Sequence, residues 1–255
     1  MKILFNSYQA INIMKGGPKY KILQLKSSLE KLGVTIKLFN SWNNDTYDLV
    51  HLFNAHSGTY HYARSLKLDN KKYIINPIFY SKHSHYKVKS FLLAQGLLNS
   101  FINGFMSEIL MTQDVCRNSE FVLPNTLEEK NMLIKGLGIN ANNMSIIHNG
   151  VEKRFIDASP NIFIKKYNIR NFILHVGHIG AKRKNTYNLI KAINRLDCPS
   201  VFIGNILNNK EGMKCKFLIE RSNNILYLGW VKHDDVMLES AYAACHSFVL
   251  PSLYE

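Results

Sequence analysis

The sequence is poor in the residues that mark several common classes of protein. Its four cysteines, Cys116, Cys198, Cys215 and Cys245, lie far apart and form no C-x-x-C pair, which indicates neither a zinc site nor a disulfide framework. No apolar run reaches the ~20 residues that a membrane-spanning helix needs, and the N-terminus is too short and polar for a signal peptide. We therefore expect a globular, cytoplasmic protein with free thiols.

Acidic residues are scarce as well. The 18 Asp and Glu stand against 32 Lys and Arg, and the net charge is +14. Two interpretations stay open: a solvated, Lys-rich surface, and attraction to a polyanion such as a sugar nucleotide, anionic lipid or nucleic acid. No basic stretch has an RNA-binding aromatic pattern or a helix-turn-helix context, so nucleic acid is the weakest of these partners.

Motifs of several enzyme classes are missing too. The ten histidines show neither H-x-x-x-H nor H-E-x-x-H spacing, so no metal site is expected. There is no G-x-S-x-G elbow and no Walker lysine loop. Asp234-Asp235 has the look of paired catalytic carboxylates, but a helical pattern follows directly, and helix capping is the better interpretation.

Short apolar runs alternate with helical patterns along the chain, which is typical of parallel sheets with crossover helices. We predict an α/β fold of two tandem Rossmann-like units, the second one incomplete. The first unit is 1–150, a polar linker is 151–171, and the second unit is 172–255. Strands are predicted at 2–6, 34–39, 47–53, 72–75, 120–123, 144–147, 172–176, 201–204, 225–228 and 247–250, and helices after Gly17 up to Gly33, at 84–112, after Thr126, and at 184–196, 211–221 and 234–244.

The predicted helical stretch 84–112 has two interpretations. Its apolar positions fall on one side, namely Val88, Phe91, Leu92, Leu98, Ile102, Phe105 and Ile109. Six lysines flank it: Lys67, Lys71, Lys72, Lys82, Lys87 and Lys89. The pattern suits an ordinary core helix with a basic loop, and it also suits docking on anionic lipid.

Two glycine-bearing segments lie between a predicted strand and a predicted helix. Gly16-Gly17 lacks the full G-x-G-x-x-G and is weak evidence for an anion site, because a plain tight turn would look the same. The segment 177–185 (GHIGAKRKN) is stronger. Positive side chains at a helix N-terminus oppose the helix dipole unless an anion lies among them, and Lys and Arg both suit a diphosphate.

Polar residues also gather at predicted strand ends. His51 lies on the third strand, and Asn54 and His56 follow its end, where ligand groups collect in open α/β sheets. A lone histidine is more often structural. At the other end of the chain, Glu255 follows the strand-like run 247–250 and a Pro-Ser break, so a carboxylate is placed just past a strand.

These landmarks resemble the retaining nucleotide-sugar glycosyltransferases of family 4, which have the GT-B fold. The resemblance covers nearly the whole chain. It rests on five segments in the family's order: 122–130 (VLPNTLEEK), 146–151 (IIHNGV), the loop 177–185, 228–231 (LGWV) and 248–255 (FVLPSLYE). In the family, the first Glu of the last motif is followed by a second eight residues later, and this sequence ends at the first.

The resemblance implies transfer of a sugar from a nucleotide diphosphate to an acceptor hydroxyl, with retention of configuration and without a cofactor or metal. Residues 1–150 would be the acceptor side, with candidates His51, Asn54 and His56, and 172–255 would bind the nucleotide sugar. The acceptor would be a glycan, a lipid-linked molecule or a protein. The implied donor-site residues are Gly16, Gly17, Gly177, His178, Gly229, Trp230 and Val231, with Lys184, Arg183 and Glu255 as catalytic residues.

The sequence also departs from the family. His178 stands where the family has arginine, and the second Glu, which holds the ribose, is absent from the sequence. We therefore expect this chain by itself not to turn over a nucleotide sugar. The alternatives are an inactive pseudo-glycosyltransferase and a membrane-surface binding fragment. The cytoplasm is the expected location, with contact at the inner face of a membrane as a possible addition.

Overall fold

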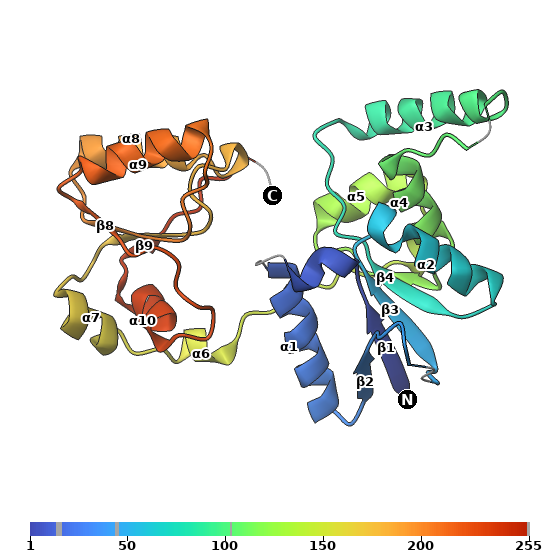
Figure 1. The fold of residues 1–255 in the computed structure, drawn as a ribbon, viewed down its shortest axis with the longest axis horizontal. Coiled ribbons are helices and arrows are strands. Elements are labelled where there is room, and N and C mark those ends of the chain that lie inside the picture. Colours follow the sequence, from blue (N-terminus) through green and yellow to red (C-terminus); the bar gives the residue numbers. More distant parts are fainter. Residues whose placement is uncertain (14–16, 44–45, 103, 254–255) are drawn as a thin grey trace. The chain divides into compact units, whose positions relative to one another are not determined.

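The computed structural model describes the whole chain except residues 14–16, 44–45, 103 and 254–255. Contacts divide it into two compact units, Met1–Gly150 and Val151–Glu255. Each unit is built around its own parallel β-sheet with helices on both faces (Figure 1). The fold is therefore α/β with two Rossmann-like units in tandem, as predicted.

The first unit has a five-stranded sheet of order β2-β1-β3-β4-β5, in which all neighbours are parallel. Its strands are β1 Lys2–Asn6, β2 Thr35–Leu38, β3 Leu49–Phe53, β4 Tyr73–Asn76 and β5 Phe121–Val122. Its helices are η1 Gln9–Asn12, α1 Gly17–Lys31, α2 Ser57–Leu68, α3 His85–Asn99, α4 Glu108–Arg117, α5 Leu127–Lys135 and η2 Ala141–Asn143.

Two apolar clusters cover the faces of this sheet. One joins β3 and β4 to α2, α4 and α5 through side chains such as Leu52, Ile75 and Leu133. The other packs Ile22 of α1 on Phe5 and Ile36. Because parallel strands end at the same edge of a sheet, the loops after β1, β3, β4 and β5 gather at the carboxyl edge, where α/β proteins bind ligands.

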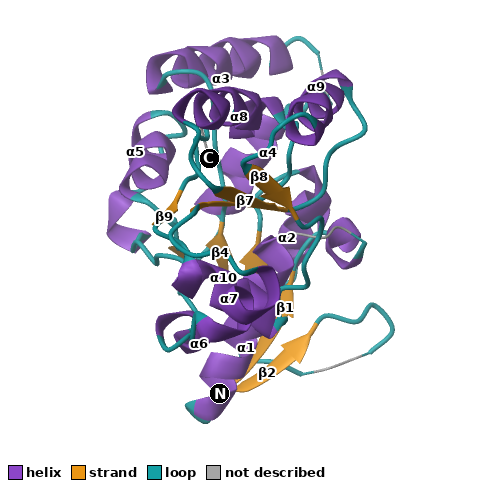
Figure 2. Cartoon of the chain, turned by 90° about the vertical axis from the view of Figure 1, so that its left-hand side faces the viewer, coloured by secondary structure: helices purple, strands orange, loops and turns teal. Residues whose placement is uncertain are grey.

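The second unit has a four-stranded parallel sheet of order β8-β7-β6-β9. Its strands are β6 Ile173–Val176, β7 Ser200–Ile203, β8 Ile225–Tyr227 and β9 Ser247–Phe248, and its helices are α6 Lys153–Ile156, α7 Asn161–Tyr167, η3 Lys182–Lys184, α8 Thr186–Leu196, α9 Lys210–Glu220 and α10 Val236–Ala244. Helices α8 and α9 lie on one face of the sheet and α7 and α10 on the other (Figure 2).

The predicted linker 151–171 differs from the structure. It carries two short helices, and Phe163 of α7 is fully buried in the core of the second unit. Ser240 of α10 fastens α7 there, because its hydroxyl accepts from the Phe163 N–H at 2.9 Å and donates to the Ser159 carbonyl at 2.7 Å. The sequence of this segment is mostly polar because only one face of its helices is apolar.

The predicted helix over 84–112 is wrong as a single element. The chain forms α3 and α4 with an irregular segment between them, in which Gly104 has a φ of +87°. The hydroxyl of Ser107 caps the new helix by accepting from the Leu110 N–H at 3.2 Å. Of the predicted inward positions, Phe91, Leu98, Ile102 and Phe105 are exposed, and only Val88 is fully buried.

Smaller differences occur elsewhere. Helix α2 was missed, and the predicted strand 144–147 makes only an isolated bridge, between Met144 and Val122. Helix α1 ends at Lys31, and Leu32, directly after it, is exposed. Helix α8 begins at Thr186, after Lys184, because Asn185 adopts a left-handed conformation with a φ of +53°.

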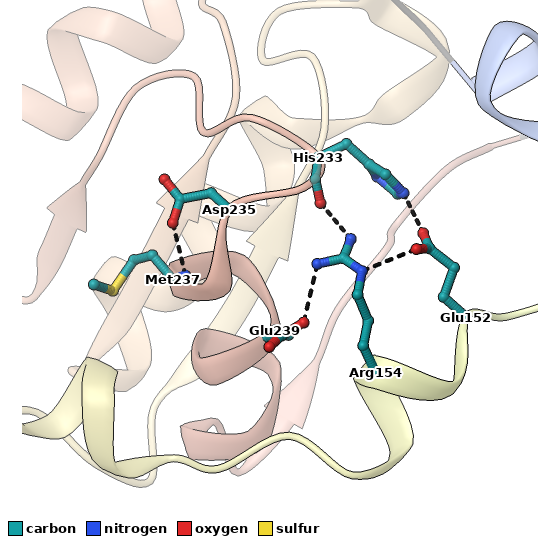
Figure 3. A network of polar contacts seen from close by, with 6 residues as sticks. All are labelled: Glu152, Arg154, His233, Asp235, Met237 and Glu239. Atoms are coloured by element: carbon teal, nitrogen blue, oxygen red, sulfur yellow. Dashed lines mark hydrogen bonds and ion pairs between the residues drawn. The ribbon is translucent and has the colours of Figure 1, made fainter.

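The start of the second unit is held by an ionic network around Arg154 of α6 (Figure 3). Its guanidinium donates to Glu152 at 2.9 Å, to Glu239 of α10 at 3.0 Å and to the backbone carbonyl of His233. The His233 ring contacts the other carboxylate oxygen of Glu152. The network fastens the segment after Gly150 to the loop that precedes α10, whose N-cap is Asp235.

Candidate functional site

The carboxyl edge of the second sheet is made of glycines in direct backbone contact. Gly177 follows β6, Gly204 follows β7 and Gly229 follows β8, and all three have positive φ. The Gly204 N–H donates to the Gly229 carbonyl at 2.7 Å. A Cβ added to Gly204 would lie 1.9 Å from the Gly177 oxygen, so no other residue fits there without displacing backbone.

A second glycine contact fixes the loop after β6. Gly180 has a φ of +90°, and a Cβ on it would lie 2.3 Å from the Cα of Gly212 in the first turn of α9. Ile179, directly before Gly180, is fully buried and forms an isolated β-bridge with Ile206. The loop after β6 is therefore fixed by contacts of its backbone.

Three consecutive cations follow this loop. Lys182, Arg183 and Lys184 form the short helix η3 directly before α8. The Arg183 carbonyl accepts from the Leu253 N–H at 2.8 Å, which brings the loop after β9 to the same place. Glu255, two residues further on, and Gly16 both lie outside the described residues. Gly17 opens α1 of the first unit, and a Cβ on it would meet no atom within 4 Å.

Three buried polar atoms at this edge have no hydrogen-bond partner among the described residues: His175 Nε2, His178 Nδ1 and Thr186 Oγ1. The Nδ1–H of His175 donates to the Val249 carbonyl at 3.0 Å, so Nε2 is left as an acceptor. A Cβ on Gly177 would lie 3.8 Å from it. Burial lowers the pKa of His175, with a smaller contribution from the charge of Lys184, and the ring is neutral. Unsatisfied polar atoms are rare in protein interiors and call for a partner such as a ligand or water.

The structure brings His178 and Trp230 together from two different loops. Their rings are nearly parallel, with 6.2 Å between centroids. Trp230 is partly exposed, and Val231, the next residue, packs against the core cluster on the α10 face. Of the donor-site residues predicted in this unit, Gly177, His178, Gly229 and Trp230 therefore meet at one sheet edge.

The first unit has an open cavity of ≈ 360 Å³ at the carboxyl end of β3 and β4. Among the predicted acceptor-side residues, only His56 lines it. The remaining lining residues come from the loop after β3, the loop 78–83 and helix α4: Ala55, Ile78, Phe79, Tyr80, Ser81, Lys82, His83, Glu108, Ile109 and Thr112. The His56 side chain also caps α2, because its Nδ1 accepts from the Gly58 N–H at 2.8 Å. Glu108 accepts from the Ser57 hydroxyl at 2.5 Å and from the Ser57 N–H at 3.0 Å, and these bonds, that of the hydroxyl above all, lower the pKa of its carboxyl group.

His51 and Asn54 lie away from this cavity. His51 is buried between Phe5 and Phe53, with its Nε2 2.8 Å from the Asn76 oxygen. Since the Asn76 amide nitrogen donates to the Leu123 carbonyl, its oxygen is the acceptor and His51 Nε2 carries the proton. Burial lowers the pKa of His51 to about 4. Asn54 ends β3 in a left-handed conformation, with a φ of +71°.

Sequence reasoning missed one functional-looking group, Glu129. It lies in the first turn of α5, is buried, and accepts from the Asn125 N–H at 2.6 Å and the Phe79 N–H at 2.8 Å. Burial raises the pKa of its carboxyl group. Lys21 of α1 contacts the Asn125 side chain. The available signal was the N-T-x-x-E spacing, because Thr126 caps α5 by accepting from the Glu129 N–H.

Among the residues that the structure describes, no group of three or more His, Cys, Asp and Glu side chains is placed to hold a metal ion. None of the helices in this part of the chain is long and apolar enough to cross a membrane.

No family model matches the chain, and no curated protein matches it. Solved structures match over almost its whole length. Sucrose-phosphate synthase from Thermosynechococcus elongatus has a TM-score of 0.71 at 14% identity, covering 100% of this chain and 76% of that one. A glycosyltransferase from Rickettsia africae has a TM-score of 0.61 at 16% identity, covering 99% and 73%. HepE of Anabaena, solved with UDP and glucose, has a TM-score of 0.60 at 16% identity, covering 99% and 74%.

These likenesses show the fold. The chain has the two-unit GT-B architecture, and the second unit is incomplete relative to the structures that it matches. At such low identity the neighbours do not carry over a donor, an acceptor or a stereochemical course.

Proposed function

We propose that this protein is a nucleotide-sugar glycosyltransferase of the retaining, family 4 type, which moves a sugar from a nucleoside diphosphate to an acceptor hydroxyl. The observation that carries the proposal is the carboxyl edge of the second sheet. There, a backbone-fixed glycine loop, three cations and three unpartnered buried polar atoms occur together. The resemblance of five sequence segments to family 4 supports the same assignment.

The chemical demand of this reaction is the departure of the diphosphate. In the proposed site, Lys184 and Arg183 would stabilise the negative charge that develops on it, helped by the first-turn N–H groups of α8. Thr186 is the first residue of α8, and its hydroxyl has a proton to donate to a phosphate oxygen. Because the loop is fixed by backbone contacts, its dipoles need little reorganisation during the reaction.

The other donor-site roles follow from the same proposal. His178 and Trp230 would lie beside the nucleotide, with Gly229 giving the backbone room near the base. His175 Nε2 would accept a hydrogen bond from a ligand hydroxyl. The resemblance to family 4 also implies donor contacts for Gly16 and Gly17 and a sugar contact for Glu255. No metal, cofactor or side-chain nucleophile is part of the proposed mechanism.

The proposed partners are a nucleotide sugar and an acceptor that occupies the cavity lined by His56 and Glu108. The acceptor would be a glycan, a lipid-linked molecule or a protein. We place the activity in the cytoplasm, with peripheral contact at the inner face of a membrane.

A nucleotide-release assay tests the activity. UDP-, GDP- and ADP-sugars are offered with pooled acceptors to the 255-residue chain and to any longer product of its gene. We expect release in the longer product, and we expect the Lys184→Ala variant to lose it while the Lys165→Ala variant keeps it, since Lys165 is an exposed lysine of α7. Absence of release with every donor in both proteins, or equal release by both variants, would contradict the proposal.

A further inference from the structure

The C-terminal half of helix α3 has polar side chains on its buried side and leucines on its exposed side. The side facing its own unit carries Val88, Leu92, Gln95 and Asn99, so its C-terminal half buries an amide and half-buries another. Gln95 bonds inward to the Phe105 carbonyl and the Ser107 hydroxyl. The leucines of the same half lie on the outside. A surface helix in water normally places them the other way.

The exposed side chains form one continuous apolar line. Tyr86, Leu93, Leu97 and Phe101 follow each other at seven-, four- and four-residue spacing, which places them on one face, and they are 73%, 63%, 69% and 87% exposed. Four more exposed apolar residues lie in α3 and the segment that follows it: Phe91, Leu98, Ile102 and Phe105. We call these eight residues the α3 surface. Monomeric proteins rarely leave contiguous apolar surfaces of this kind in water.

The charges around the α3 surface have one sign. No Asp or Glu occurs between Asp69 and Glu108. Lys87 and Lys89 are exposed in the first turns of α3, on either side of the apolar line, and Lys82 precedes the helix. A second copy of this chain is disfavoured as the occupant, because a symmetric contact would bring these lysines together. An anionic surface complements them.

We propose that the α3 surface docks this protein on the anionic face of a lipid bilayer. Helix α3 would lie in the interface, with its leucines and the aromatic residues that follow it in the acyl boundary, and its lysines on lipid phosphates. In Figure 1, α3 lies outermost on its unit, beyond α4 and α5, as this contact requires. A helix of 15 residues is too short to span the bilayer, so the contact is peripheral.

The position of the α3 surface also bears on the acceptor. Lys82 and His83 line the cavity of the first unit and lie two or three residues before α3 begins. A docked unit would hold this cavity near the headgroup layer. An acceptor carried by a membrane lipid would then reach it without leaving the bilayer; this consequence rests on the proposed function, whereas the docking itself does not.

Vesicle co-sedimentation of the full chain tests the docking. We expect binding to vesicles that contain phosphatidylglycerol and about tenfold weaker binding to pure phosphatidylcholine, because each lysine near an anionic surface adds to the attraction. Replacing Leu93, Leu97 and Phe101 by serine should weaken binding at least tenfold. The matched control replaces three equally exposed leucines elsewhere, Leu32, Leu68 and Leu196, and should bind as the parent does.

A charge pair sharpens the test. Lys87→Glu with Lys89→Glu should abolish the preference for anionic vesicles, whereas Lys71→Glu with Lys72→Glu, at the opposite end of β4, changes the net charge equally and should keep it. Circular dichroism of each variant confirms folding. Unchanged binding in the triple serine variant would overturn the proposal. So would a concentration-dependent dimer in sedimentation velocity that this variant abolishes, without vesicle binding by the parent. The readout is binding alone, so it is independent of transferase activity.

Discussion

The two units present the same edge of the same kind of sheet, but they hold it in different ways. In the second unit the loops are fixed by backbone-to-backbone glycine contacts, and three consecutive cationic residues follow the loop after β6. In the first unit the loops are fixed by buried side chains, with His51 on Asn76 and Glu129 on the N–H groups of Asn125 and Phe79. Glycine contacts suit a ligand that must approach the backbone, such as a diphosphate. The first unit instead has an open cavity of ≈ 360 Å³ at this edge.

The difference predicts a steep steric penalty in the second unit. Gly204→Ala should lower the free energy of unfolding of that unit by about 3 kcal/mol or more, because its Cβ would lie 1.9 Å from the Gly177 oxygen. Gly229→Ala is the matched control. It shares a positive φ but meets no atom within 4 Å, and should cost only about 1 kcal/mol. Urea unfolding followed by Trp230 fluorescence measures both, and equal costs would show that the glycine contact is not tight.

The buried histidine of the first unit should make that unit sensitive to acid. His51 has a pKa of about 4 in the folded state, below that of an unfolded histidine at ~6.5. Between these values the unfolded chain binds more protons, so stability is full above pH ~6.5 and falls as the pH drops toward 4. The loss should reach roughly 3 kcal/mol.

Hydrogen exchange of the β3 amides across this pH range measures the effect, with His51→Gln as the reference. The comparison is needed because the raised pKa of Glu129 acts in the opposite direction: its stabilisation is greatest at low pH and is lost as the pH rises. Parallel curves for the parent and His51→Gln would contradict the assignment of a neutral buried ring.

Lys184 is the residue at which we expect a substitution to affect catalysis. Lys184→Ala in an active, full-length protein should lower kcat/KM by ~10²-fold, since the loss of one group that stabilises developing charge typically costs that much. Stability should hardly change, because the loop is fixed by its glycines. Lys165→Ala should leave kcat/KM as it is. Unchanged kinetics in Lys184→Ala would mean that Lys184 is only a surface cation.

The ionic network at the start of the second unit should contribute less to the free energy of unfolding than the Gly204 contact does. Arg154→Met removes the contacts to Glu152, Glu239 and the His233 carbonyl but keeps most of the apolar side chain. We expect a loss of about 1–2 kcal/mol, since the group is partly exposed and its ion pairs are screened by solvent. High salt should shrink the difference from the parent in urea unfolding, and a salt-independent difference would point to packing instead.

The smallest effect is expected at His178. Arginine can donate two parallel N–H bonds from a fixed positive charge to a phosphate, which an imidazole ring cannot do. His178→Arg should therefore tighten nucleotide binding about fivefold. Calorimetric titration of the variant and the parent measures the two affinities. Equal affinities would remove His178 from the site.

The strands could be predicted from sequence because β3, β6 and β7 are short apolar runs between polar turns. Helix α2 was missed because its inward residues Tyr60, Ala63 and Leu66 are separated by polar ones, and its cap is a histidine. The break between α3 and α4 was missed because 100–107 contains no proline. The loop 177–185 was found by its local motif. The contacts of Gly204 and Gly212 could not be found, since each depends on a partner from another βα loop.

The carboxyl edge of the second sheet is the proposed binding site for a nucleoside diphosphate. Trp230, the one tryptophan of that unit, lies beside His178 at this edge, so its fluorescence is a direct probe. Titrating the Trp42→Phe protein with UDP, GDP and ADP should give saturable quenching with at least one of them, weakened about tenfold or more by Lys184→Ala and unaffected by Lys165→Ala. No saturable change with any of the three nucleotides, or equal weakening by both substitutions, would contradict nucleoside diphosphate binding at this edge.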